Sequence, residues 1–103
     1  SEAQWVMRKR IRCSGYAPPG AQIEIQHLID GTWQSVSSVQ GSLQANENGR
    51  FVVTFRMGYL YGDGGFQSYI PVRVRQIFNE MTSPWQTETP TGRPLRYYIV
   101  SYP

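Results

Sequence analysis

Two stretches of the chain alternate apolar and polar residues with a period of two. One side of residues 50–57 carries Phe51, Val53, Phe55 and Met57. One side of residues 68–78 carries Ile70, Val72, Val74 and Phe78, with Arg73 and Arg75 on the other. Successive side chains of a strand point to opposite faces, so this pattern is typical of half-buried antiparallel strands. We expect the core to contain Phe51, Val53, Phe55, Ile70, Val72 and Val74.

Weaker alternation and turn residues predict the rest of an all-β chain. We expect further strands at 5–13, 21–28, 32–39, 41–45, 85–88 and 95–102, with a loop at 58–65 and a long connection at 79–94. Asp30-Gly31 and Asn48-Gly49 predict tight turns with glycine at positive φ, and uneven alternation predicts a bulge near Ser37. The fold expected is a β-sandwich of about seven antiparallel strands with no substantial helix.

The turn residues carry a family resemblance. The run from Gly15 to Ala21, the following Ile23 and Ile25, and the turns at Asp30-Gly31 and Asn48-Gly49 resemble the skeleton of bacterial immunoglobulin-like modules. The run from Tyr69 to Val74 and the later Ser83-Pro84-Trp85 are similar to the penultimate strand and exit loop of fibronectin type III domains. The resemblance implies an immunoglobulin-like fold, which hosts many unrelated functions.

Length and composition fit one packed domain. The chain has 103 residues, of which 40% are hydrophobic and 17% charged, with a net charge of +3. We expect residues 1–103 to be a single immunoglobulin-like domain excised from a larger protein. No apolar run is long enough to span a membrane and no leader is visible, so a targeting signal would lie elsewhere in the parent chain. We expect an extracellular or cell-surface protein of bacterial or phage origin.

Residues for catalysis or metal binding are few. His27 is the only histidine and Cys13 the only cysteine, so a zinc cluster or a disulfide cannot form within the chain. A Cys13–His27 dyad is conceivable, but a strand cysteine is typically a small buried hydrophobe. Asp63 and residues 46–48 offer oxygen ligands for calcium, yet neither segment has several acids at alternating positions. We expect no catalytic residue, no metal and no cofactor.

Aromatic residues form the first candidate ligand site. The chain has 3 Trp, 7 Tyr and 4 Phe, more rings than one small core requires. Rings in loops can stack on sugars or anchor a protein partner, so the candidate residues are Tyr59, Tyr61, Phe66 and Trp85. The alternative is structural: Trp33 and Tyr69 fill the core, and Trp85 covers an open edge.

Arginines form the second candidate surface. Arg8, Arg10 and Arg12 share one face of the first strand, and Arg73 and Arg75 share one face of a later strand. Such stripes attract nucleic acid or acidic glycans, although solvated outer faces explain them equally well. A net charge of +3 without a nucleic-acid motif argues against nucleic acid.

The sequence therefore predicts a non-enzymatic binding or assembly module, an accessory domain recognising a carbohydrate or protein partner through exposed loop aromatics. The alternative is a structural spacer with no ligand. The two differ in whether Tyr59, Tyr61 and Trp85 form one exposed patch.

Overall fold

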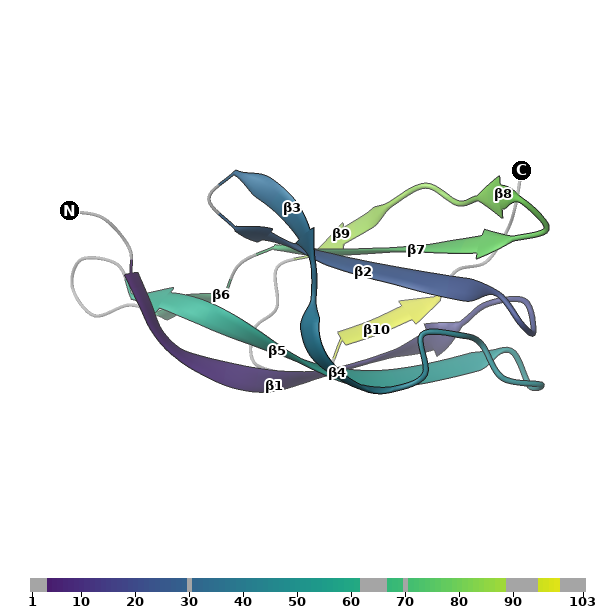
Figure 1. The fold of residues 1–103 in the computed structure, drawn as a ribbon, viewed down its shortest axis with the longest axis horizontal. Helices are drawn as coiled ribbons and strands as arrows, with labels where there is room; N and C mark the ends of the chain where they lie inside the picture. Colours follow the sequence, from purple (N-terminus) through teal and green to yellow (C-terminus); the bar gives the residue numbers. More distant parts are fainter. Residues whose placement is uncertain (1–3, 30, 62–66, 70, 89–94, 99–103) are drawn as a thin grey trace.

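The computed structural model describes residues 4–29, 31–61, 67–69, 71–88 and 95–98. These residues form two β-sheets that lie as two layers (Figure 1). Sheet A has the order β10 (Leu95–Tyr98), β1 (Gln4–Tyr16), β5 (Arg50–Tyr61) and β4 (Ser37–Gly41), and β6 (Gln67–Tyr69) also pairs with β5. Sheet B has the order β3 (Thr32–Ser35), β2 (Gln22–Ile29), β7 (Val72–Phe78) and β8 (Met81–Thr82), and β9 (Gln86–Glu88) also pairs with β7.

The predicted all-β sandwich is confirmed, since none of the described residues is helical. Accordingly, no described helix is long and apolar enough to cross a membrane. The described residues form ten strand segments, more than the seven or so expected, because several predicted strands are divided. One pairing departs from the prediction, because β10 runs parallel to β1.

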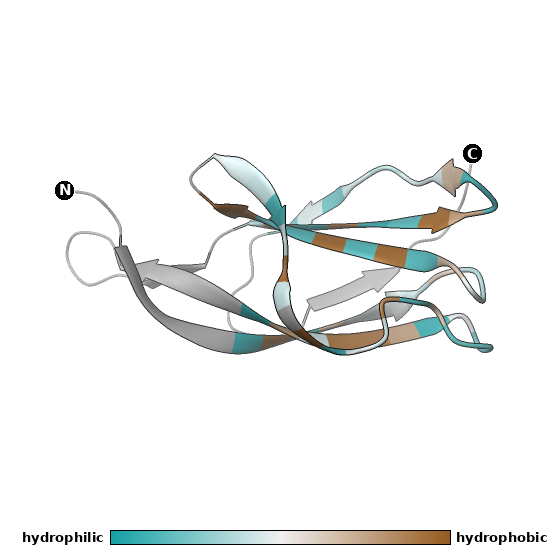
Figure 2. Ribbon diagram, in the orientation of Figure 1, coloured by the Kyte–Doolittle hydropathy of each residue, from teal (hydrophilic) through white to brown (hydrophobic). Residues whose placement is uncertain are grey.

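The core lies between the sheets, as the alternation predicted. Phe51, Val53 and Phe55 on β5 are buried, and so are Val72 and Val74 on β7. Ile70 lies outside the described residues. Figure 2 shows brown apolar and teal polar positions alternating along β2, where Ile23 and Ile25 face the core. Each large apolar side chain removed from water contributes about 1.5 to 3 kcal/mol, so this shared layer dominates the stability of the fold.

The chain changes sheets at two places where the sequence predicted continuous strands. Residues 32–39 divide at Val36 into β3 of sheet B and β4 of sheet A, and the predicted irregularity is this crossing plus a register shift between Ser37 and Gln40. Residues 68–78 divide before Pro71, which has no N–H to continue a ladder and instead accepts a hydrogen bond from Leu28 N at 3.0 Å. Each half therefore pairs in a different sheet.

The turns behave largely as predicted. Gly31 and Gly49 have φ of 78° and 74°, and a Cβ at Gly49 would stand 2.6 Å from the carbonyl oxygen of Ala17. The predicted 41–45 strand is reduced to an isolated bridge between Gln44 and Gln22. The sequence missed the hairpin joining β7 to β8, whose turn residues Asn79 and Glu80 have positive φ. The expected short strand near Trp85 is β9.

Candidate functional site

Tyr59 and Tyr61 do not lie in a loop, which corrects the prediction for the glycine-rich segment. Strand β5 continues through Gly58 to Tyr61, because β1 pairs with it on one side and β6 on the other. Glycine weakens a strand, but here the ladders on both sides supply hydrogen bonds that hold the backbone extended. The side chains of Tyr59 and Tyr61 lie outside the described part of the structure, as does all of Phe66. The described residues therefore provide no test of one aromatic patch.

Trp85 belongs to a stack of rings and guanidinium groups on the outer face of sheet B. The Arg73 guanidinium carbon lies 4.1 Å from the Trp85 ring centroid and 4.3 Å from that of Trp33. The Arg75 guanidinium carbon lies 4.2 Å from the Trp85 centroid. Arg73 and Arg75 are two residues apart on one strand, about 7 Å, so an indole about 4 Å from each lies between them. The order of the stack is Arg75, Trp85, Arg73 and Trp33.

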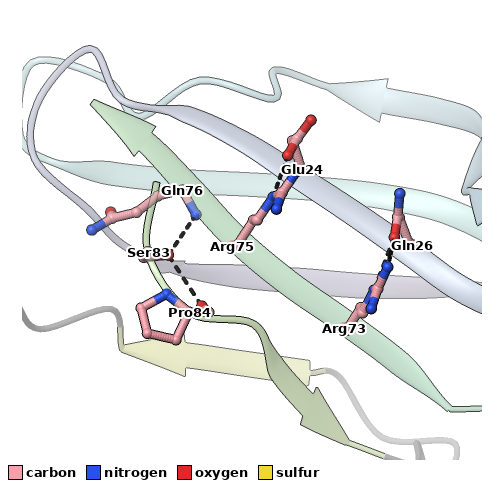
Figure 3. Close-up of polar contacts among 7 residues, drawn as sticks. All are labelled: Glu24, Gln26, Arg73, Arg75, Gln76, Ser83 and Pro84. Atoms are coloured by element: carbon pink, nitrogen blue, oxygen red, sulfur yellow. Dashed lines mark hydrogen bonds and ion pairs between the residues drawn. The ribbon is translucent and has the colours of Figure 1, made fainter. Parts of the chain in front are cut away.

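The same two arginines are held by polar side chains of β2 (Figure 3). Arg73 donates through Nε and Nη2 to Oε1 of Gln26 at 2.8 and 2.6 Å. Arg75 donates through Nε to Oε1 of Glu24, forming a half-exposed ion pair. With the stack, these contacts connect β2, β3, β7 and the segment carrying Trp85. We call the set of Glu24, Gln26, Trp33, Arg73, Arg75 and Trp85 the arginine–tryptophan clamp.

A buried hydroxyl positions Trp85 for this stack. Ser83 Oγ accepts a hydrogen bond from Gln76 N at 2.9 Å and donates to the Pro84 carbonyl at 3.2 Å. Ser83 N donates to the Gln76 carbonyl at 2.9 Å. The chain entering β9 is therefore fixed against β7. Trp33 packs on Arg73 instead of filling the core, so the structural alternative was wrong for that ring.

The arginines of sheet A lie in a different environment. Arg10 and Arg12 are exposed on β1, as predicted, and Arg56 on β5 is directly opposite Arg10. Six residues from Arg56, Arg50 is opposite Tyr16, with its guanidinium carbon 5.8 Å from the Tyr16 ring centroid. The register also places Arg8 opposite Gly58 and Arg96 opposite Ser14, although the side chains of Arg8 and Arg96 are not described. We call the outer surface of sheet A that carries the exposed Arg10, Arg12, Arg50 and Arg56 the basic face.

Sequence charge separates the two sheets. The strands of sheet A contain no Asp or Glu and hold seven of the ten Lys and Arg residues, namely Arg8, Lys9, Arg10, Arg12, Arg50, Arg56 and Arg96. The strands of sheet B hold two of each sign, namely Glu24, Glu88, Arg73 and Arg75. The net charge of +3 thus understates the charge density of one side of the molecule.

No hydrogen bond or ion pair offsets the central arginines of the basic face. Within the described part of the chain, Arg10, Arg12 and Arg56 have neither contact, and the one ion pair there joins Arg75 to Glu24. Like charges directly opposite each other on neighbouring strands are destabilising. The predicted basic residues therefore form two groups: Arg73 and Arg75 are engaged in the clamp, whereas Arg10 and Arg12 lie with Arg56 in a sheet whose strands contain no Asp or Glu.

Cys13 is unsuited to nucleophilic chemistry. It is fully buried on β1, and burial raises its pKa to about 12, with a smaller contribution from Glu88. At neutral pH the thiol is protonated and shielded from solvent, as expected for a cysteine that acts as a small core hydrophobe. Among the described residues no three His, Cys, Asp or Glu side chains are placed to hold a metal ion.

Comparison of the chain with protein-family models, curated proteins and solved structures finds no match. The functional argument therefore depends on the two outer faces.

Proposed function

We propose that the chain is a non-enzymatic, immunoglobulin-like recognition or assembly module that binds an acidic partner through the basic face of sheet A. The observation that carries the proposal is the exposed pair Arg10 and Arg56, opposite each other with no carboxylate on any strand of the sheet. Arginine suits this role because its planar guanidinium binds carboxylate, sulfate or phosphate through two parallel hydrogen bonds.

The loop-aromatic site proposed from the sequence receives less support. Trp85 lies between two guanidinium groups, so neither face of its indole is open to stack on a sugar ring. Tyr59 and Tyr61 belong to a paired strand. We therefore move the proposed binding surface from the loop to sheet A. An immunoglobulin-like identity and an extracellular location rest on the sequence resemblance.

A structural spacer is the second candidate, and the arginine–tryptophan clamp favours it. Three strands and the segment carrying Trp85, connected by stacking and hydrogen bonds, make a stiff sheet, which a spacer requires. The basic face separates the two functions, because a spacer gains nothing from unpaired like charges.

The test compares two double variants that lower the net charge equally. Arg10→Gln with Arg56→Gln removes the charges from the basic face, and Gln22→Glu with Gln34→Glu places acids at exposed positions of sheet B. Binding to immobilised polyanions carrying carboxylate, sulfate or phosphate is measured at several salt concentrations. We expect the arginine variant to lose affinity and to reduce the salt slope by about 2, while the sheet B variant binds nearly as the parent does. Equal losses of affinity in both variants would mean that binding depends only on the net charge of the chain, and this would refute the proposal.

A further inference from the structure

We infer that the acidic partner is a linear polysaccharide bearing carboxylate or sulfate groups and lying along β1 and β5. This inference rests on the proposed function and specifies the chemistry of its ligand. Three features of the basic face carry it: the line that the charges follow, the residues between them, and the scarcity of exposed rings.

The charges follow the strand direction. Arg10, Arg12 and Arg56 gather near the middle of β1 and β5, and Arg50 lies about 20 Å further along β5, the length of six strand residues. Arg8 precedes Arg10 by two residues on β1, with its backbone opposite Gly58. A single small anion would reach one group of charges and leave the other unpaired. A chain with repeated acidic groups can meet both.

Hydroxyl groups occupy the space between the charges. Thr54 is opposite Arg12, and Ser14 is the next residue of the same face on β1, opposite the half-buried Val52. Both Ser14 and Thr54 are half-buried, so their hydroxyls lie at the level of the sheet surface. A hydroxyl is both a donor and an acceptor, which suits the hydroxyl groups of a sugar. The side chains are short, so a ligand can approach the sheet closely.

Exposed rings are nearly absent from the described side chains of this face. Single-stranded nucleic acid binds where bases stack on aromatic side chains. Tyr16 is the one large exposed apolar side chain here, 46% exposed, and it lies at the end of the face beside Arg50. A protein partner is disfavoured by the same fact, since the centre of a protein interface is usually apolar and aromatic. Among the described side chains of this face, charged and hydroxyl groups outnumber the single exposed ring of Tyr16, and this composition favours an acidic sugar chain.

The experiment titrates the whole chain with six probes by calorimetry at physiological salt. Heparin supplies sulfate, polygalacturonate supplies carboxylate, and dextran supplies a neutral sugar chain. Oligothymidylate, a DNA duplex and poly-L-glutamate supply repeated negative charges without the free hydroxyl groups of a polysaccharide. We expect heparin or polygalacturonate to bind at least about tenfold more tightly than the nucleic acids and polyglutamate, a difference of about 1.4 kcal/mol, and dextran not to bind.

Two variants sharpen the result. Arg10→Gln with Arg56→Gln should weaken polysaccharide binding strongly while Arg12 and Arg50 retain part of it. Ser14→Ala with Thr54→Val should weaken polysaccharide binding by about three- to tenfold and leave polyglutamate binding unchanged, provided that both proteins melt near the parent temperature. Unchanged polysaccharide affinity in the hydroxyl variant would overturn the inference. The inference would also fail if nucleic acid or polyglutamate bound as tightly as the polysaccharides or more tightly. If that binding still required Arg10 and Arg56, the proposed function would stand. If no probe depended on Arg10 and Arg56, both proposals would fail.

Discussion

The outer faces of sheets A and B use the same residue in opposite ways. On sheet B, Arg73 stacks on two rings and Arg75 on one, and each donates a hydrogen bond to a side-chain oxygen of β2. On sheet A, Arg10 and Arg56 are opposite each other, and within the described residues neither side chain contacts a ring or a hydrogen-bond acceptor. The first arrangement stabilises the fold whether or not a partner is present. The second lowers stability slightly, and its repulsion is relieved only when an anion binds, which makes it the better candidate for function.

Replacing Trp85 with Ala should have the largest effect, because it removes the central ring of the arginine–tryptophan clamp. Both arginines lose a stacking partner, each stacking being worth about 0.5 to 1 kcal/mol at an exposed site, and the packed indole is lost as well. We expect a loss of about 2 to 3 kcal/mol in the free energy of unfolding by urea denaturation, with polyanion affinity unchanged. A stable variant with reduced binding would instead assign the site to sheet B.

Cys13 offers a second contrast, between the inner and outer sides of β1. Its folded-state pKa of about 12 exceeds the ordinary thiol value of 9.0. The unfolded chain therefore releases this proton first, and the stabilising contribution is complete below about pH 9 and falls as pH rises towards 12 by about 1.4 kcal/mol per pH unit. Cys13→Ala should flatten this alkaline decline in denaturation curves. An unchanged decline would assign it to other groups.

Arg73→Lys and Arg56→Lys separate geometry from charge. Lysine keeps the charge but cannot donate through Nε and Nη2 to Gln26, and it stacks less well on indole. We expect Arg73→Lys to lose about 1 kcal/mol in unfolding free energy and Arg56→Lys to lose almost none. Equal effects on the two faces would remove the distinction between clamped and free arginines.

The alternation of apolar residues predicted much of this arrangement. It identified the buried side of β5 and β7, and it placed Arg10 and Arg12 on the outer side of β1. It also left Arg56 on the outer side of its strand, so every member of the central group was visible in the sequence. What alternation cannot supply is register. The pairing of Arg10 with Arg56 depends on which residue of β5 meets β1, a choice made by the packed core as a whole.

Two features of the candidate sites were not predicted, each for a physical reason. The glycines around Tyr59 and Tyr61 are typical of a loop, but β1 and β6 supply hydrogen bonds that no local propensity encodes. The stacking of Trp85 on Arg73 and Arg75 was not predicted, because it depends on the pairing of β9 with β7. Local pattern thus predicted faces, and long-range pairing decided their chemistry.

The smallest predicted effect has an unusual sign. Arg10→Gln should raise the free energy of unfolding by about 0.3 kcal/mol at low salt, because it removes the repulsion with Arg56 across the β1–β5 ladder. For a chain of this size the corresponding rise in melting temperature is about 2 °C, measurable by calorimetry on matched samples. Added salt should shrink the difference, since it screens the repulsion between exposed charges. Gln34→Glu, which lowers the net charge equally on sheet B, is the control and should give little or no rise.

Greater stability combined with weaker polyanion binding is expected of a surface that serves a partner. A loss of stability in Arg10→Gln would instead mean that the arginines support the fold, and it would favour the spacer.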